Sequence, residues 1–282
     1  MGVELKSGRI VDATLDRYRV KPGKRFSIAD FDPADRSEHS KKGKEADTAA
    51  LVKLQGRLDV LQDVLYAQAK HRILLVLQGT DTSGKDGTIR HVFKDVNPMG
   101  LRTQSFKKPT EPELARDYLW RAHAHVPADG ELVVFNRSHY EDVLVLRVHG
   151  TIDDERAEQR FAHIRDFERM LVEEGTTIVK VFLHISEEEQ AERLQSRLDR
   201  PDKHWKFSSA DVEERAFWAD YQRVYQDAIG ATSTEQAPWY VVPADRKWYR
   251  NLAVSSILVE TLERLDMSFP DPEEGLEDVV LD

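Results

Sequence analysis

The sequence contains no cysteine, and this absence excludes several kinds of chemistry. Without thiols there is no disulfide scaffold, no thiolate-bound metal and no cysteine nucleophile. The absence fits a reducing compartment, and we expect a cytoplasmic protein. Long apolar runs are also lacking: none approaches the ~20 residues of a membrane-spanning helix, and residues 1–6 carry no hydrophobic signal core. We therefore expect no membrane partner.

The chain also lacks a positive net charge. Its 41 basic and 51 acidic residues give a formal charge of −10 over 282 residues. Such a surface repels a nucleic-acid backbone, and the sequence has no stripe of basic and aromatic residues, so we expect no nucleic-acid partner. A polyanionic ligand would need a local basic groove. With 40% hydrophobic residues, the chain suffices for one large domain or one domain with appendages.

The most informative stretch is an apolar run that leads into a glycine-rich loop. Ile73–Leu77 has the pattern of a strand buried on both faces, and Gly79–Lys85 follows with the spacing G-x-x-x-x-G-K. A helix is predicted over 88–96, stopped by Asn97-Pro98. Strand, glycine loop and helix in this order are typical of a phosphate-binding P-loop, whose inward N–H groups and helix N-terminus attract anions.

The loop departs from the usual pattern at two positions. Asp86 stands where a Ser or Thr normally follows the lysine and holds Mg²⁺, and Asp81 places another carboxylate inside the loop. Carboxylates in an anion site are unfavourable unless a cation lies between them and the phosphate. The loop therefore favours a metal-bridged, highly charged substrate, with Lys85 as a mobile charge for the terminal phosphates. The alternative is a glycine-rich turn that binds nothing.

Strands and helices alternate around this loop. Further strands are predicted at 101–106, 131–135, 177–185 and 239–242, and further helices at 47–70, from 110 to before Pro127, at 151–174, from 186 to Pro201, at 208–229 and at 252–265. The alternation indicates an α/β fold with a parallel sheet of about five strands and helices on both faces. Functional sites then lie at the carboxyl ends of the strands, where Gly79, Lys107, Asn136 and Asp245 fall.

We expect three parts along the chain. Residues 1–45 are polar and irregular and form an arm over the main domain or a neighbouring subunit; 46–267 form a P-loop kinase domain with a lid at about 186–216; 268–282 form an acidic tail. The helix over 47–70 carries leucines at alternating spacings of three and four. This stripe is either core or subunit contact. Together with the arm it favours a homo-oligomer, a dimer or a tetramer, although burial within one subunit explains the stripe equally well.

Basic residues gather between the last two predicted strands. Three arginines spaced four and three apart share one helix face, two lysines follow, and another arginine lies one turn into the next helix: Arg193, Arg197, Arg200, Lys203, Lys206 and Arg215. A lone basic face is usually solvated. In a P-loop protein, however, kinases of small substrates place a lid here. Because phosphoryl transfer depends on positioning and charge neutralisation, converging Lys, Arg and metal indicate such a kinase.

Four motifs together resemble the family-2 polyphosphate kinases. They are G-x-D-x-x-G-K-D-G at Gly79–Gly87, Phe135-Asn-Arg-Ser-His-Tyr140, Lys203-His-Trp-Lys206-Phe, and Pro238–Trp248. The resemblance covers roughly residues 15 to 265, with the motifs in the family's order. It implies a three-layer, thymidylate-kinase-like fold with a helical lid. It also implies reversible phosphoryl transfer between inorganic polyphosphate and adenine or guanine nucleotides, with Mg²⁺, or alternatively Mn²⁺, as the cofactor.

The resemblance also implies roles for individual residues. In catalysis, Asp81 would hold the metal, Lys85 would grip polyphosphate, Arg137 would contact phosphate at the transfer point, and Arg193 and Arg197 would close over it. The other phosphate-binding positions would be Gly79, Thr82, Ser83, Gly84, Asp86, Gly87, Lys203, Lys206 and Arg215. The nucleotide would contact Lys107, Lys108, Pro109, Asn136 and Glu141, and Asp211 would order the lid.

Two positions bear on which nucleotide accepts the phosphate. Asn136 stands where many members have Asp, so metal binding there is weaker or comes through water. Glu141, followed by Asp142, stands where many members have Asn-Arg, a variant that resembles the subfamily acting on both mono- and diphosphates. The carboxylate of Glu141 could hold another Mg²⁺ or a water that bridges a shorter acceptor. The alternative for Glu141 is a surface helix residue.

Two rival functions remain open. The first is an ATP-dependent nucleoside monophosphate kinase, against which Asp81 and the basic track from Lys203 to Lys206 argue. The second is a non-catalytic P-loop protein that binds nucleotide or polyphosphate. The presence of Lys85 and the lid arginines argues against this one.

Overall fold

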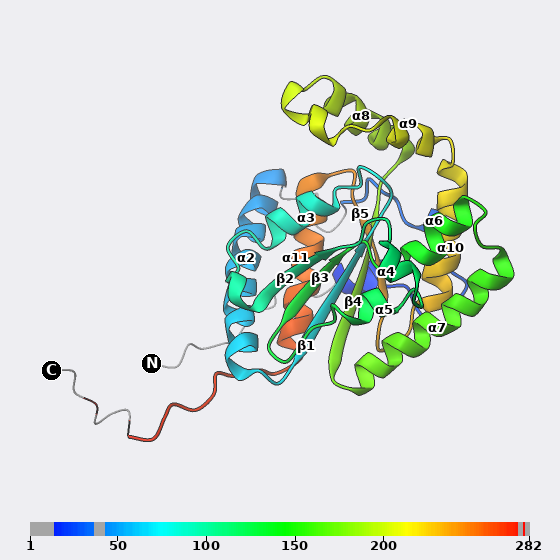
Figure 1. Ribbon diagram of the computed structural model, residues 1–282. Helices are drawn as coiled ribbons and strands as arrows, with labels where there is room; N and C mark the ends of the chain where they lie inside the picture. The colour runs from blue at the N-terminus through cyan, green and yellow to red at the C-terminus, as the bar shows by residue number, and fades with distance from the viewer. Residues whose placement is uncertain (1–13, 37–42, 276–278, 280–282) are drawn as a thin grey trace.

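The computed structural model describes residues 14–36, 43–275 and 279. One sheet of five parallel strands forms its centre, in the order β2-β3-β1-β4-β5 (Figure 1). The strands are β1 (Arg72–Gln78), β2 (Leu101–Ser105), β3 (Leu132–Asn136), β4 (Thr176–His184) and β5 (Trp239–Pro243). The predicted α/β fold with a five-stranded parallel sheet is confirmed.

Helices cover both faces of the sheet and project beyond one end. On one face lie α2 (Gly43–Gln68), α3 (Lys85–Val92) and α11 (Lys247–Glu263); on the other lie α6 (Glu141–Val148), α7 (Asp154–Glu173) and α10 (Trp218–Thr232). The segment of α8 (Glu187–Leu198), η3 (Pro201–Lys206) and α9 (Ser209–Arg215) extends above the carboxyl ends of the strands (Figure 1). The short remaining helices are α1 (Thr14–Tyr18), η1 (Ile28–Asp30), η2 (Pro98–Gly100), α4 (Glu111–Leu114) and α5 (Trp120–His123).

The central strand β1 shows why this sequence forms a sheet buried on both faces. Successive side chains of a strand point to opposite faces. Ile73, Leu75 and Leu77 accordingly pack in the core beside α2 and α11, whereas Leu74 and Val76 pack in the core beside α6, α7 and α10. All five side chains are fully buried. The strand is thereby fixed as the rigid base of the glycine loop that follows it.

The leucine stripe of α2 lies inside the molecule. Leu54, Leu58, Leu61 and Leu65 are buried in the same core as the apolar residues of α11. Of the two interpretations of the stripe, the structure therefore supports core. Self-association stays a prediction, and the stripe no longer supports it.

The described part of the N-terminal arm lies along β5. Arg19 forms an antiparallel bridge with Tyr240, and the N–H of Val20 donates to the carbonyl of Trp239 at 2.8 Å. The hydroxyls of Tyr18 and Tyr249 lie 2.8 Å apart. Residues 1–13 and 37–42 of the predicted arm lie outside the described residues, as do 276–278 and 280–282 of the predicted tail.

Several predicted helix boundaries are wrong. The helix expected from residue 110 is two short helices, because the Asp117 carboxylate accepts from the N–H groups of Leu119 and Trp120 and starts a new turn. The helix expected over 208–229 is broken between α9 and α10 at Phe217, and α10 continues through Gly230. Helix α6 was not predicted. In addition, α3 and α11 begin three and five residues earlier than expected, at Lys85 and Lys247.

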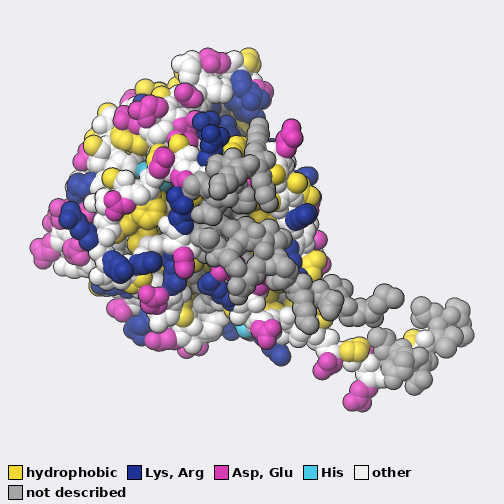
Figure 2. Space-filling view, turned by 180° about the vertical axis from the view of Figure 1, so that it is seen from behind, with side chains coloured by type: hydrophobic (Ala, Val, Ile, Leu, Met, Phe, Trp, Pro, Cys, Tyr) yellow, Lys and Arg dark blue, Asp and Glu magenta, His cyan; other side chains and the backbone are white. Residues whose placement is uncertain are grey.

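Basic and acidic side chains are interspersed over the described part of the face shown in Figure 2. In the part of the chain that the structure describes, none of the helices combines the length and the apolar character that a membrane span requires.

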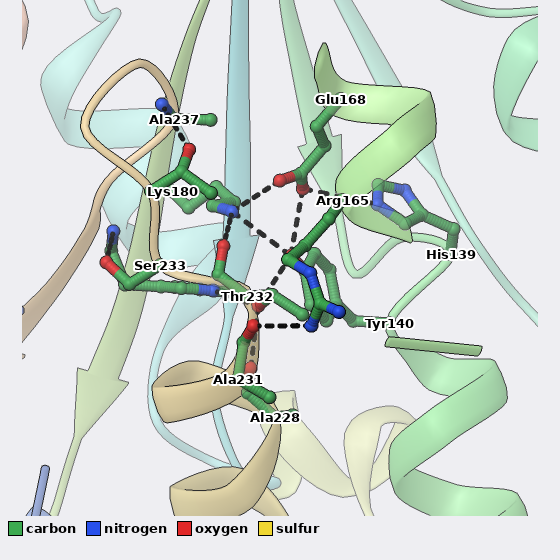
Figure 3. A network of polar contacts seen from close by, with 12 residues as sticks. His139, Tyr140, Arg165, Glu168, Lys180, Ala228, Ala231, Thr232, Ser233 and Ala237 are labelled. Atoms are coloured by element: carbon green, nitrogen blue, oxygen red, sulfur yellow. Dashed lines mark hydrogen bonds and ion pairs between the residues drawn. The ribbon is translucent and has the colours of Figure 1, made fainter. Parts of the chain in front are cut away.

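A buried polar network joins β4 to α7, to the end of α10 and to the segment before α6 (Figure 3). The ammonium of Lys180, on β4, contacts the Glu168 carboxylate of α7 at 2.5 Å and donates to the carbonyl of Thr232 at 2.8 Å. The Tyr140 hydroxyl donates to Glu168 at 2.8 Å, and the Trp239 indole donates to the Thr232 hydroxyl at 2.9 Å. The network therefore ties the segment between β3 and α6 to the strands and to the base of α10.

We predict that Lys180→Met destabilises the fold by about 3–5 kcal/mol, because it leaves the Glu168 carboxylate buried without its counter-ion. Urea denaturation measures the free energy of unfolding. The double variant Lys180→Met/Glu168→Leu should regain most of the loss, since it removes both charges. Arg169→Ala, which breaks an exposed pair with Glu173 on α7, should change nothing measurable. A Lys180→Met protein as stable as the parent would contradict this account of the network.

Candidate active site

The glycine loop between β1 and α3 has the backbone shape that a phosphate cradle requires. Gly84 caps α3 with a left-handed φ of 98°, and Thr82 also has a positive φ, 64°, which is unusual for a residue with a side chain. Because α3 begins at Lys85, the N–H groups of its first turn have no partner within the helix and face the loop. The sequence prediction of a P-loop therefore agrees with the local geometry.

Lys85 is held by the loop itself. Its ammonium donates to the carbonyls of Gly79 at 2.7 Å and Thr80 at 3.2 Å, and the side chain is buried. Burial, followed by the nearby charge of Arg137, lowers the pKa of Lys85 to about 8. An arriving anion would favour the charged form of this amine and would offer it a stronger partner than two carbonyls.

Arg137 bridges the two carboxylates that were predicted to bind metal. It follows β3 directly and has a φ of 62°. Its guanidinium donates to Asp81 at 2.6 Å and to Glu141, the first residue of α6, at 3.4 Å. Three of the predicted catalytic and metal positions thus meet at the carboxyl ends of β1 and β3.

Asn136 and Asp86 support each other. The side-chain amide of Asn136 donates to the Asp86 carboxylate at 2.8 Å. This contact holds the Asp86 carboxylate at the start of α3, and the predicted phosphate contact of Asp86 stays a prediction. Asn136 had been assigned to the nucleotide, and in this structure its amide is turned to the loop.

Arg193 lies behind the loop and does not reach over it from the lid. One guanidinium nitrogen donates to the carbonyls of Thr82 and Ser83, both at 2.9 Å, and another donates to the carbonyl of Ala244 at 2.5 Å. Its Nε pairs with Glu189 at 2.6 Å, and the side chain is buried. The predicted phosphate contact of Arg193 stays a prediction. What the structure assigns to this residue is the support of the loop.

The lid brings together two of its predicted residues. Arg197 of α8 donates to the Asp211 carboxylate of α9 at 3.0 Å, which joins the two lid helices. Arg215 turns back to the start of α8, where it donates to Gln190 at 3.0 Å. The ammonium of Lys203 lies 3.3 Å from the carboxylate of Asp202. The side chain of Lys206 lies outside what the structure describes.

One open cavity of about 700 Å³ connects these elements. It is lined by the glycine loop, the ends of β2 and β3 and the lid: Asp81, Thr82, Gly84, Lys85, Asp86, Gly87, Ser105, Phe106, Lys107, Lys108, Asn136, Arg137, Arg197 and Trp205. The predicted Pro109 is not among the lining residues. Glu141 lines a smaller neighbouring cavity, together with Asp81 and Arg137.

The cavity includes an aromatic residue to which the sequence had assigned no role. The side chain of Trp205, in the lid, is 76% exposed and lies on the same cavity as Lys107 and Lys108. A large exposed aromatic beside a basic cavity is a signal for base stacking. The motif around Trp205 had been interpreted through its lysines alone.

A parallel sheet of this strand order, a phosphate loop after its central strand, and basic side chains converging on one cavity define a P-loop kinase. The comparison with known proteins is more specific. A family model described as "Polyphosphate kinase 2 (PPK2)" matches residues 39–270. The chain belongs to the polyphosphate kinase 2 family, as its motifs predicted.

Individual relatives agree with this assignment. The "AMP/ADP-polyphosphate phosphotransferase" of Meiothermus ruber is 56% identical over 268 residues, which cover 95% of this chain and 100% of that protein. The "ADP-polyphosphate phosphotransferase" of Rhodopseudomonas palustris is 46% identical over 227 residues, 76% of this chain and 78% of that protein. The crystal structure of polyphosphate kinase 2 from Arthrobacter aurescens TC1 matches with a TM-score of 0.91, at 44% identity and 95% coverage of both chains.

We predict that binding of tripolyphosphate weakens as the pH rises above about 8. Below this value the Lys85 ammonium is already charged; above it the free amine must take up a proton on binding, so the dissociation constant rises toward roughly tenfold per pH unit. Calorimetry at about pH 7 and about pH 9, in buffers of different ionisation enthalpy, measures both affinity and proton uptake.

Lys85→Arg is the matched control, because arginine stays charged throughout this range. Ionisation of the ligand affects both proteins alike. Identical pH profiles in the two proteins would show that Lys85 is not the titrating group.

Proposed function

We propose that this chain transfers the terminal phosphate of inorganic polyphosphate to AMP and ADP, making ADP and ATP in a reversible reaction. The observation that carries the proposal is the single cavity in which the glycine loop, Arg137, Arg197 and the Lys107–Lys108 segment meet. The names of the relatives from Meiothermus ruber and Rhodopseudomonas palustris support the same donor and acceptors.

The donor chain binds across the glycine loop and continues along the lid. The amides at the start of α3 hold the terminal phosphates, and Lys85 moves from the loop carbonyls to the phosphate. Arg197, which lines the cavity, and Lys203 extend the positive track toward the rest of the polymer. A polymer with a charge on every unit uses such a track better than a triphosphate does.

The nucleotide occupies the side of the cavity next to Lys107 and Lys108. Trp205 closes over its base from the lid, and stacking on an aromatic face tolerates different bases, which is why we include adenine and guanine nucleotides. In the transfer step an acceptor phosphate oxygen attacks the terminal phosphorus of polyphosphate, the bridging P–O bond breaks, and the shortened chain leaves. Arg137, at the junction of the two sides, neutralises charge on the transferring group.

The residues fit a divalent metal that arrives with the substrate. Mg²⁺ takes one or two carboxylates and completes its shell with water and phosphate oxygens. Asp81 and Glu141 offer two carboxylates on either side of Arg137. In the described part of the chain, no group of three or more acidic or histidine side chains could hold a metal without the substrate. When bound, Mg²⁺, or Mn²⁺, would supply charge neutralisation for the phosphates.

We predict ADP and ATP formation from AMP, and ATP formation from ADP, with long-chain polyphosphate and Mg²⁺ in the absence of ATP. Lys85→Ala should lower kcat by roughly 10²–10³-fold, because it removes a charge aimed at the transferring phosphate. Lys94→Ala, an exposed lysine just beyond α3, is the matched control and should keep full activity. Product formation that requires ATP as donor would favour a nucleoside monophosphate kinase, and ligand binding without turnover would favour a non-catalytic protein.

The acceptor range gives a separate prediction. Glu141→Asn should lower the rate with AMP relative to ADP, because the carboxylate that holds a bridging ion or water for the shorter acceptor is lost. Initial rates with each acceptor at saturating polyphosphate measure the ratio. Glu173→Asn, an exposed carboxylate of α7, is the control. An unchanged AMP-to-ADP ratio would remove Glu141 from acceptor choice and leave the rest of the proposal intact.

A further inference from the structure

Arg250 is a buried arginine that the proposed reaction has not used. It lies in the first turns of α11 and is 2% exposed. Its guanidinium donates to the carbonyl of Ser83 at 3.3 Å and to the side-chain oxygen of Asn251 at 2.8 and 3.1 Å. Within the described chain these partners are all uncharged. A buried cation with uncharged partners is costly, so its presence needs a reason.

The Ser83 carbonyl is shared by two arginines. Arg193 donates to it at 2.9 Å and Arg250 at 3.3 Å, from α8 and α11 respectively. Arg193 has Glu189 as its ion-pair partner, whereas Arg250 has none in the described ranges. Burial and the adjacent charge of Arg193 both lower the pKa of Arg250. The free protein therefore carries an uncompensated positive charge directly behind the loop.

Gly84 shows how closely this charge approaches the loop. A Cβ at Gly84 would collide with the Arg250 guanidinium, and Gly84 itself lines the open cavity on the other side. One residue of backbone thus separates Arg250 from the space proposed for phosphate.

Because the peptide bond is planar, the hydrogen bonds to the Ser83 carbonyl also fix the orientation of the Ser83–Gly84 peptide. In a trans peptide the C=O and the following N–H point in opposite directions. Because the two arginines hold the Ser83 carbonyl behind the loop, the N–H of Gly84 points to the cavity side. Losing one of the two donors would let this peptide rotate, and the amide would no longer be aimed at an anion.

We propose that Arg250 is a positioning residue for the phosphoryl donor: it fixes the Ser83–Gly84 peptide with its N–H toward the cavity, and the polyphosphate bound there supplies the counter-charge that Arg250 lacks. This inference rests on the proposed function, since it needs a polyanion in the cavity. The proposed role concerns the donor and not the acceptor, because Lys107 and Lys108 follow β2 at one edge of the sheet, whereas α11 packs on α2, α3 and the opposite edge strand β5. It also predicts that binding a polyanion stabilises the protein partly through Arg250.

The test compares wild type with Arg250→Met, using tripolyphosphate as the probe. Calorimetry should show binding at least about tenfold weaker in the variant, and the rise in Tm on adding tripolyphosphate should shrink. The KM for ADP should stay within about twofold while the KM for polyphosphate rises. Without ligand, the Tm of the variant should be equal or higher, because an unpaired buried charge has been removed. If Arg250 merely stabilised the fold, its replacement would instead lower the Tm.

Arg264→Met is the matched control, since Arg264 follows α11 directly and its exposed side chain pairs with Glu260. It should leave all these quantities unchanged. Arg250→Lys keeps the charge but loses the planar fork, so it should fold like wild type and bind tripolyphosphate with intermediate affinity. This variant keeps the test valid if Arg250→Met does not fold.

Wild-type affinity for tripolyphosphate in Arg250→Met, or in Arg250→Lys if Arg250→Met does not fold, would overturn the inference alone. An equal rise in the KM values for polyphosphate and ADP, with a lower Tm, would also overturn it. Failure of the wild-type protein to bind tripolyphosphate would instead refute the proposed function. The two failures are therefore distinguishable.

Discussion

The site depends on where the carbonyl oxygens of one short turn point. A loop that binds an anion through its N–H groups must turn its C=O groups elsewhere, and a buried carbonyl needs a donor. Here the carbonyls of Thr82 and Ser83 are held by Arg193. Thr82 has a positive φ, an unfavourable backbone conformation that persists only where surrounding contacts hold it, and the hydrogen bonds from Arg193 are such contacts. The same guanidinium also binds the carbonyls of Ala244 and Asp245, after β5. Arg193 therefore joins the loop, α8 and the segment after β5.

On the cavity side of the loop, ion pairs hold the charged side chains in place. Arg137 lies between Asp81 and Glu141, so its charge is neutralised until a more negative ligand arrives. Its position depends on the segment between β3 and α6, and three residues later Tyr140 is anchored in the buried network with Glu168 and Lys180. The segment that carries Arg137 is therefore anchored, through Tyr140, to an ion pair that lies deep in the protein. The same network binds the end of α10, the helix that leads down from the lid.

The sequence predicted those parts of the fold that local chemistry determines. The strand before the glycine loop, the loop itself and the start of a helix at residue 110 depend on residues close in the chain, and the structure has all three. The break between α4 and α5 depends on the Asx turn of Asp117, whose capping preference the helical pattern concealed.

Contacts between distant residues had no such signal. Arg250 and Ser83 are 167 positions apart, and nothing in the helical pattern of α11 indicates a contact with the loop. The spacing of Arg193 and Arg197 correctly indicated one side of α8, but Arg200, predicted to share that side, lies beyond the end of the helix. Spacing also does not say what a helix side faces. Arg193 turned out to lie behind the loop, whereas Arg197 lines the cavity.

The most direct test of the account is a crystal structure of the protein with tripolyphosphate and Mg²⁺. We expect phosphate oxygens within hydrogen-bonding distance of the Gly84 and Lys85 amides, with the Lys85 ammonium moved from the loop carbonyls to the phosphate. The carbonyls of Thr82 and Ser83 should still be held from behind. A polyphosphate bound away from the loop, or a loop whose carbonyls had left the arginines, would contradict the account.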